Sequence, residues 1–552
     1  MSEPSARSLR SAGIGIPRPW MFWSGMTAVA LGVGVHVPMF LDAGDMDYML
    51  HGMGFDAEMV AGMVAIGIGL VLTGIGLVPR RRPDTARIPS VDVSVDEGKV
   101  GVAHAALLSV LTVAVVIDAM KPAALAFVAP GMREEYGIGR DTVGLLPLAG
   151  ASGMVFGALL WGHFGDRVGR RAAILYSGVL FTATAVCGAM PYYGLNVFMC
   201  FFMGIGVGGM IPITFALLAE TIPAKHRGFA MVMVGAAVAS AYAVTSALNT
   251  WLVPELSWRI LFLVGLPTGL LLIMLNRWIP ESPRFLVGMG HRKEAEAVLG
   301  RFGAKLQVQR TAATAAKAIE GRWWDIVSRD YLGLTVAICL VGFSAGFLAF
   351  GFQLWAPSSL TDLGVAKGDV DGLIRNAAFI AIPVSAAVAP AYGYWSSRGT
   401  IIAVALLVLT ALAVLIVGGA DLASSRLALY ALIALPIAGA SSLIMIVAAY
   451  SSEVFPTEIR ARGGGAAVSA SRGGGVLIVL SVVFSIVSPS LEAMSIAGAG
   501  ALILALAVFI PKGIETRQRS LETITREEFL APAGPSLETI AREELRAESA
   551  AP

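Results

Sequence analysis

The sequence predicts an all-α polytopic membrane protein with about 14 transmembrane helices. Two observations support this prediction. The 552 residues are 56% hydrophobic and only 14% charged, whereas a soluble domain averages roughly 45–50% apolar and about 25% charged residues. The apolar residues also occur in runs of about 20 or more, the length that a helix needs to cross the hydrocarbon core. This composition argues against a soluble enzyme, a nucleic-acid-binding protein and a disordered scaffold.

The predicted spans form groups of two, six and six along the chain. They cover residues 20–41, 59–78, 102–130, 142–161, 172–190, 196–219, 229–253, 258–278, 331–356, 372–395, 400–418, 427–449, 465–487 and 493–510. We therefore expect an N-terminal segment (1–19), an accessory two-helix hairpin with its linker (20–100), a first six-helix bundle (101–278), a central loop (279–330), a second bundle (331–511) and a polar tail (512–552).

Basic residues gather in alternate connections between the spans. The 42–58 loop carries five acidic residues and neither Lys nor Arg, whereas the connections around 80–82, 162–171, 225–227, 284–293 and 460–462 are basic. Because basic loops stay in the cytoplasm, this alternation places both termini and the central loop there. The first 15 residues are polar and contain no signal peptide. The prediction is a bacterial cytoplasmic (inner) membrane protein.

Net charge and cysteine usage exclude other classes. The formal charge is +2, from 40 basic and 38 acidic residues, which does not suggest a polyanionic partner. Cys187, Cys200 and Cys339 each lie in an apolar run, where cysteine behaves as a small buried residue, so no metal site is predicted. No zinc-protease, redox, Walker or nucleophile-elbow motif is present. We therefore predict neither an enzyme nor a cofactor, and any transport would use an ion gradient.

One loop carries a specific pattern: Gly162-His-Phe-Gly165-Asp166-Arg167-Val-Gly169-Arg170-Arg171. Gly165 and Gly169 permit a tight turn with positive φ, and Asp166 can cap a helix N-terminus or pair with arginine. The pattern resembles the signature loop of the major facilitator superfamily, between its second and third core helices. The resemblance implies two repeated six-helix bundles, here preceded by two extra helices.

Further segments resemble the sugar-porter-like and aromatic-acid:proton-symporter-like branch over about residues 101–530. These are Trp258-Arg259, Pro280-Glu281-Ser282-Pro283-Arg284, Glu220 to Arg227, Glu453 to Arg460, and Glu515-Thr516-Arg517. Glu220 with Arg227, and Glu453 with Arg460, occupy matching positions in the two halves, at cytoplasmic helix ends. Ion pairs there can lock the bundles together, so these residues and Glu281 and Arg284 are predicted to form a gate. The alternative is that they only anchor the topology.

Three charged residues, Asp118, Lys121 and Arg472, lie well away from the ends of predicted spans, where burial is expensive and function is the default explanation. Asp118 and Lys121 lie three residues apart and can share a helix face, and Pro122 can weaken that helix. Arg472 is flanked by small residues that allow close approach of helices. We predict that Asp118 carries a proton and that Lys121 or Arg472 contacts an anionic group. Alternatively, Asp118 and Lys121 neutralise each other and only fix helix packing.

The resemblance sharpens one of these assignments. Aromatic-acid:proton symporters carry D-G-Y-D where this chain has Asp118-Ala-Met-Lys121. Relatives also usually carry arginine where Cys200 precedes the glycine run of the fourth core helix. We infer that Lys121 supplies this missing positive charge from a neighbouring helix. Further polar and aromatic residues in the spans are predicted to line the cavity, namely Asn249, Gln353, Trp355, Asn376 and Tyr450.

The predicted function is proton-coupled transport of a small organic solute, an organic anion by preference, through alternating access. Two alternatives remain within transport: a neutral sugar or polyol porter, and a multidrug effluxer. An alternative from another class is a solute sensor that signals through its tail, where residues 520–530 recur as 536–546. The expected partners are the solute and the lipid bilayer, with protein contacts through the hairpin or the tail and none with nucleic acid.

Overall fold

The computed structural model describes residues 16–54, 56–78, 100–238, 240–304, 323–362, 383–418, 426–483 and 491–529. Within these ranges the chain forms helices and no strand. Thirteen helical segments there are long and apolar enough to cross a membrane, and each matches a predicted span. The remaining predicted span, 372–395, lies partly outside the described residues.

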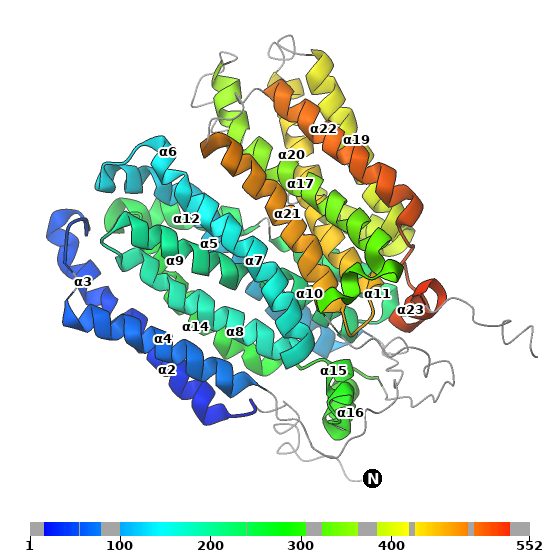
Figure 1. Ribbon diagram of the computed structural model, residues 1–552, viewed down its shortest axis with the longest axis horizontal. Coiled ribbons are helices and arrows are strands. Elements are labelled where there is room, and N and C mark those ends of the chain that lie inside the picture. Colours follow the sequence, from blue (N-terminus) through cyan, green and yellow to red (C-terminus); the bar gives the residue numbers. More distant parts are fainter. Residues whose placement is uncertain are drawn as a thin grey trace, which may run out of the picture.

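The accessory hairpin flanks one side of the first bundle (Figure 1). It consists of α2 (Pro19–Gly34), α3 (His36–Asp42), the 3₁₀ turn η1 (Ala43–Met46) and α4 (Ala57–Leu77). Asp56 caps α4 by accepting a hydrogen bond from the Met59 amide at 2.7 Å. Glycines let α2 and α4 approach closely, because a Cβ added to Gly25 would lie 2.7 Å from the Gly69 carbonyl oxygen.

The first bundle contains six spans, several of them built from two consecutive helices. They are α5 (Val102–Tyr136), α7 (Leu145–Val168), α8 (Arg170–Ala183) with the 3₁₀ segment η2 (Thr184–Ala189), α9 (Tyr193–Gly208) with α10 (Met210–Thr221), α11 (Ala224–Ala237) with α12 (Ser240–Leu256), and α13 (Ile260–Leu263) with α14 (Gly265–Met274) and η3 (Leu275–Trp278). The short α6 (Arg140–Val143) connects α5 to α7. Pro122 was expected to weaken the first of these helices, yet α5 continues through it without a break.

The segment between the bundles forms α15 (Pro283–Gly288), α16 (Arg292–Arg301) and the 3₁₀ turn η5 (Trp323–Val327). The helix α16 lies within the central loop predicted over 279–330. In Figure 1, α15 and α16 lie at the lower end of the bundles, which we call the α16 end. Ser282 caps α15 through a hydrogen bond from the Phe285 amide at 3.2 Å.

The second bundle contains α17 (Arg329–Asp362), a helix ending in the π turn η6 (Ala391–Trp395), α19 (Ser397–Gly418), α20 (Arg426–Val454), α21 (Arg460–Val483) and α22 (Leu491–Lys512). The first copy of the tail repeat forms α23 (Leu521–Phe529), and Ser520 caps it by accepting from the Thr523 amide at 3.0 Å. The second copy, 536–546, lies outside the described residues.

The two bundles meet along α7 and α21, which cross where the halves of the molecule face each other (Figure 1). A Cβ added to Gly162 of α7 would lie 2.5 Å from the Ala461 carbonyl oxygen of α21. Only glycine at this position allows the two backbones to come so close.

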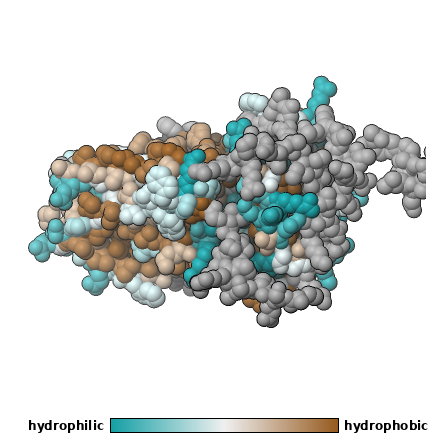
Figure 2. Space-filling view, turned by 90° about the horizontal axis from the view of Figure 1, so that it is seen from below, coloured by the Kyte–Doolittle hydropathy of each residue, from teal (hydrophilic) through white to brown (hydrophobic). Residues whose placement is uncertain are grey.

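The outer face of the hairpin is apolar, as a lipid-facing surface requires. Figure 2 shows brown side chains over much of the part of the molecule that holds the hairpin and the first bundle. On α4 this surface includes Val60, Val64, Ile68, Val71 and Ile75, all of which are exposed. The opposite face of the hairpin packs against α8, where the Tyr176 hydroxyl donates to the Leu70 carbonyl at 3.0 Å.

Replacing Gly25 by alanine should destabilise the hairpin, because the new methyl group would meet the Gly69 carbonyl and the Thr73 amide, each at 2.7 Å. We expect a loss of about 1–3 kcal/mol, measured as thermal unfolding of purified protein. Gly34→Ala is the matched control, since no atom lies within 4 Å of its added Cβ. Equal melting temperatures for the two variants would contradict the close packing of α2 and α4.

Candidate functional site

Two buried ion pairs join the bundles at the α16 end, and each crosses from one half to the other. Glu220 of α10 accepts a hydrogen bond from Arg460 of α21 at 2.8 Å. Glu453 of α20 accepts from Arg227 of α11 at 3.0 Å. All four side chains are at most 3% exposed. The two Glu/Arg pairs of the matching motifs have therefore exchanged partners between the halves.

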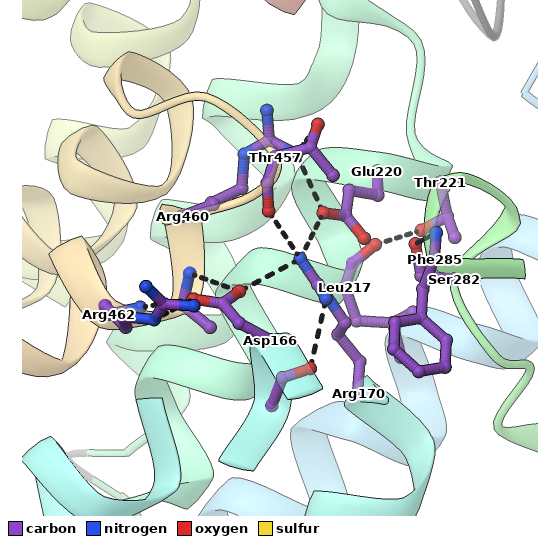
Figure 3. A network of polar contacts seen from close by, with 12 residues as sticks. Asp166, Arg170, Leu217, Glu220, Thr221, Ser282, Phe285, Thr457, Arg460 and Arg462 are labelled. Carbon is purple, nitrogen blue, oxygen red and sulfur yellow. Dashed lines mark hydrogen bonds and ion pairs between the residues drawn. The ribbon is translucent and has the colours of Figure 1, made fainter. Parts of the chain in front are cut away.

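Arg170 lies at the centre of this network (Figure 3). Its Nη2 donates to Glu220 at 3.0 Å and to the Thr457 carbonyl at 3.0 Å, and it lies 3.2 Å from Asp166. Its Nη1 donates to the Gly165 carbonyl at 3.0 Å. A single guanidinium thus contacts both bundles, as its planar set of five donors allows.

Asp166 makes both kinds of contact expected from the sequence. It accepts hydrogen bonds from the backbone amides of Ala461 at 3.2 Å and Arg462 at 3.1 Å, in the first turn of α21. It also lies 3.3 Å from the Arg462 guanidinium. The signature loop of the first bundle therefore caps a helix of the second bundle.

The turn between α7 and α8 requires Gly169, whose φ is +110°. Gly165 was predicted to share this role, but it lies inside α7 and does not have positive φ. The carboxylate of Glu281 accepts hydrogen bonds from the amides of Arg170 at 2.7 Å and Ser282 at 2.9 Å. Burial raises the pKa of Glu281, and these amides partly offset the effect.

The segment after α22 completes the second crossed pair. Thr516 and Tyr392 each donate a hydroxyl hydrogen bond to Glu453, at 2.6 and 2.7 Å. Arg227 also donates to the Arg519 carbonyl at 2.9 Å. Hydrogen bonds from three sides thus hold the Glu453 carboxylate in place.

Tyr450 belongs to this end of the molecule rather than to a cavity at mid-membrane depth. Its hydroxyl donates to the Ile514 carbonyl at 2.7 Å and accepts from the Ile514 amide at 2.5 Å. The prediction that Tyr450 lines the transport cavity is therefore not supported by its position. A tyrosine in an apolar run gives no sign of its depth in the membrane.

The remaining predicted gating residues occupy the margins of the network. Arg171 donates to Asn276 at 2.8 Å, and Arg284 interacts electrostatically with Glu220. Arg167 is exposed and makes no ion pair within the described part of the chain. Its position suits the topological role of a basic loop residue.

The second cluster lies in the middle of the helices, where Asp118 of α5 has Lys121 on its own helix and interacts electrostatically with Arg472 of α21. Asp118 and Lys121 are each 2% exposed. Asp118 interacts electrostatically with Arg472 and with Lys121, and its Oδ1 has no hydrogen-bond partner among the described residues. The Arg472 guanidinium lies 5.7 Å from the centre of the Phe350 ring. The three charges therefore come from both bundles.

Lys121 is bound by the first bundle rather than by Asp118. Its ammonium donates to the Phe181 carbonyl and, at 2.8 Å, to the Thr184 hydroxyl, and it lies 4.1 Å from the centre of the Phe181 ring. Asp118 and Lys121 form no direct ion pair in the described structure, although their charges interact electrostatically, and the alternative that they neutralise each other stays open. The inference that Lys121 replaces an arginine missing at Cys200 stays a prediction.

Of the other residues predicted to line the cavity, the structure describes only Asn249 with its side chain. Asn249 lies one turn after Thr245 on α12, which packs against α5. Gln353 and Trp355 lie on α17, but their side chains are outside the described part, and Asn376 lies outside the described residues. Thr184 was not singled out by the sequence, because a threonine in an apolar run carries no signal of its partner.

Comparison of the sequence with those of known protein families identifies the family. The sequence model of the Major Facilitator Superfamily matches residues 110–479. The chain belongs to the Major Facilitator Superfamily. The family is one of membrane transporters, so the protein is a transporter and not an enzyme, as the sequence predicted.

Similar proteins include two from Acinetobacter baylyi. The 4-hydroxybenzoate transporter PcaK is 26% identical over 264 residues, which are 46% of this chain and 57% of PcaK. The niacin transporter NiaP is 23% identical over 438 residues, which are 77% of this chain and 97% of NiaP. The solved structure of the proton:xylose symporter XylE superposes with a TM-score of 0.64 at 18% identity, over 77% of this chain and 98% of XylE. This last likeness concerns the fold.

The superfamily fold gives the two clusters distinct roles. Transporters of this kind alternate access by moving one bundle against the other around a central site. The network at the α16 end can exist only while the bundles touch there, so it marks that end as closed. The mid-membrane charges come from both bundles, and their part in binding a solute stays a prediction.

Replacing Glu220 by glutamine should weaken this closure, because Arg170 and Arg460 would be left buried against a neutral group. Breaking a buried pair costs about 3–5 kcal/mol, so we expect a lower melting temperature and faster labelling of a cysteine introduced at the α16 end. Glu296→Gln is the matched control: its pair with Arg292 is exposed and is worth roughly 0–1 kcal/mol. If the two variants behaved alike, the network would not hold the bundles closed.

Proposed function

We propose that the protein moves a small aromatic or related carboxylate across a bacterial cytoplasmic membrane together with a proton. The observation that carries this proposal is that Asp118, Lys121 and Arg472 lie at mid-membrane depth and that Asp118 interacts electrostatically with both cations. Two cationic side chains suit one carboxylate group. The similar transporters PcaK and NiaP, which carry 4-hydroxybenzoate and niacin, support this class of solute.

Charge balance suggests how the proton is coupled to the solute. With Asp118 ionised, the site holds two cations and one anion and has a net positive charge of one. Protonation of Asp118 removes the anion and leaves both cations for the carboxylate. Proton binding therefore raises the affinity for the solute, and by linkage the solute raises the affinity for the proton.

Alternating access would then proceed through the two clusters. With the α16 end closed, a solute reaches the site from the opposite end. Rocking of the bundles separates Glu220 from Arg460 and Glu453 from Arg227 and opens the α16 end. We assign this end and both termini to the cytoplasm, because the basic loops gather there.

Carboxylates should stabilise the purified protein against heat, and this effect should be smaller at the same ligand concentration when Lys121 or Arg472 is replaced by glutamine. A ligand present at 100 times its Kd adds about 2.7 kcal/mol of stability, which a thermal-shift measurement detects. The panel contains 4-hydroxybenzoate, niacin, xylose and a cationic drug. Lys293→Gln, on the exposed side of α16, is the matched control. Stabilisation by xylose alone would favour a neutral sugar porter and overturn the anion site.

Asp118→Asn should bind the carboxylate with an affinity that no longer depends on pH, because asparagine imitates the protonated acid. In the unchanged protein, affinity should rise as the pH falls. We expect the variant to exchange labelled for unlabelled 4-hydroxybenzoate in proteoliposomes but not to accumulate it under a pH gradient. Asp330→Asn, at an exposed position, should behave like the unchanged protein. Accumulation by the Asp118 variant would show that the proton is carried elsewhere.

A further inference from the structure

The accessory hairpin contacts the part of the first bundle that holds Lys121. That part is η2, the 3₁₀ segment at the end of α8. Its residues Ala185 and Val186, and Met190 just after it, are buried in one apolar cluster with hairpin residues, among them Phe22, Val29 and Val33. The hairpin helix α3 also packs against η2.

A polar contact reinforces this packing at the end opposite to α16. The Glu135 carboxylate, at the end of α5, accepts hydrogen bonds from the hairpin amides of Leu50 at 2.7 Å and His51 at 3.0 Å. The same carboxylate forms an ion pair with Arg259 at 2.6 Å, and both side chains are at most 3% exposed. The hairpin loop thus supplies two of the donors that satisfy a buried charge.

Arg259 transmits this contact to the end of η2. Its Nη1 donates to the carbonyls of Gly188 at 3.2 Å and Met190 at 2.8 Å. The Tyr136 hydroxyl donates to the Met190 carbonyl as well, at 2.8 Å. The His51 ring packs edge-on against the Tyr136 ring, with 5.3 Å between the ring centres. The backbone at the end of η2 is therefore held by residues that the hairpin contacts.

The beginning of η2 holds Lys121. Thr184, the first residue of η2, accepts a hydrogen bond from the Lys121 ammonium at 2.8 Å, and Phe181 accepts another through its carbonyl. A 3₁₀ segment has weaker hydrogen-bond geometry than an α-helix and often marks a hinge. Its position consequently depends on what packs around it.

We propose that the accessory hairpin is a positioning element of the transport site, which fixes η2 and through it the ammonium of Lys121. The inference rests on the proposed function, in which Lys121 binds the carboxylate. It concerns a part of the chain outside residues 110–479, the range matched by the superfamily model. The hairpin thereby acts on solute affinity without touching the solute.

The turn at His51 allows a selective test. The Met53 amide donates to the Leu50 carbonyl at 3.1 Å, and Gly52 has a φ of +84°, as in a type II turn with His51 in its second position. Proline is common at that position, so His51→Pro keeps the turn but removes the amide that donates to Glu135. His51→Ala is the matched control, because it removes the ring and keeps the amide.

Uptake of ¹⁴C-labelled 4-hydroxybenzoate into proteoliposomes gives the first readout. We expect His51→Pro to raise KM about three- to tenfold more than His51→Ala does, with Vmax little changed. Val186→Ala, on η2, should raise KM in the same way, whereas Val64→Ala, on the exposed face of α4, should not. In the Lys121→Gln background His51→Pro should change KM no further. If His51→Pro raised KM by the same factor in the Lys121→Gln protein as in the otherwise unchanged protein, the proposal would be overturned.

Hydrogen–deuterium exchange gives a second readout that needs no solute. His51→Pro should speed exchange in a peptide covering residues 184–190, relative to His51→Ala, because the segment loses support. Unchanged exchange there would overturn the proposal. If the unchanged protein takes up no carboxylate, the proposed function fails, while the exchange measurement still decides whether the hairpin holds η2.

Discussion

The structure depends on two buried ion pairs that cross between its halves, Glu220 with Arg460 and Glu453 with Arg227. Burying a charge is costly unless a partner and further hydrogen bonds satisfy it. Glu220 also pairs with Arg170 of its own bundle, but its pair with Arg460, like the pair of Glu453 with Arg227, crosses to the opposite bundle. These two crossing pairs therefore exist only while the α16 end is closed. When that end opens, water can solvate the separated charges. The same contacts therefore stabilise one state without making it permanent.

One helix joins this network to the mid-membrane charges. The first turn of α21 carries Arg460 and Arg462, and Arg472 follows on the same helix. Twelve residues of α-helix correspond to about 18 Å, so the ion pairs at the α16 end and the mid-membrane charges lie at two depths on one rigid element. Because Asp118 of the first bundle faces Arg472, any movement of α21 against α5 changes both the gate and the site. Coupling of this kind needs no separate pathway.

The first bundle holds its own cation in a different way. Lys121 is fixed by the Phe181 carbonyl and the Thr184 hydroxyl, both at the end of the α8 span. The hairpin packs on the far side of this segment and shares Glu135 with Arg259. The two extra helices thus form part of the scaffold behind the site, although they lie outside the twelve-helix core.

The sequence by itself determined the helical fold, the grouping of the spans, the signature loop and the three buried charges, because each depends on local composition, periodicity or spacing. Only the tertiary structure decided the partners. Ion pairs between the bundles were expected from the motifs, but only the structure showed that Glu220 binds Arg460 and that Arg227 binds Glu453. Lys121 donates a hydrogen bond to Thr184 rather than to Asp118. Tyr450 binds Ile514 near the α16 end instead of lining a cavity at mid-membrane depth. Which side chains pair depends on which helices pack together. No local sequence pattern encodes the distance between residues on different helices.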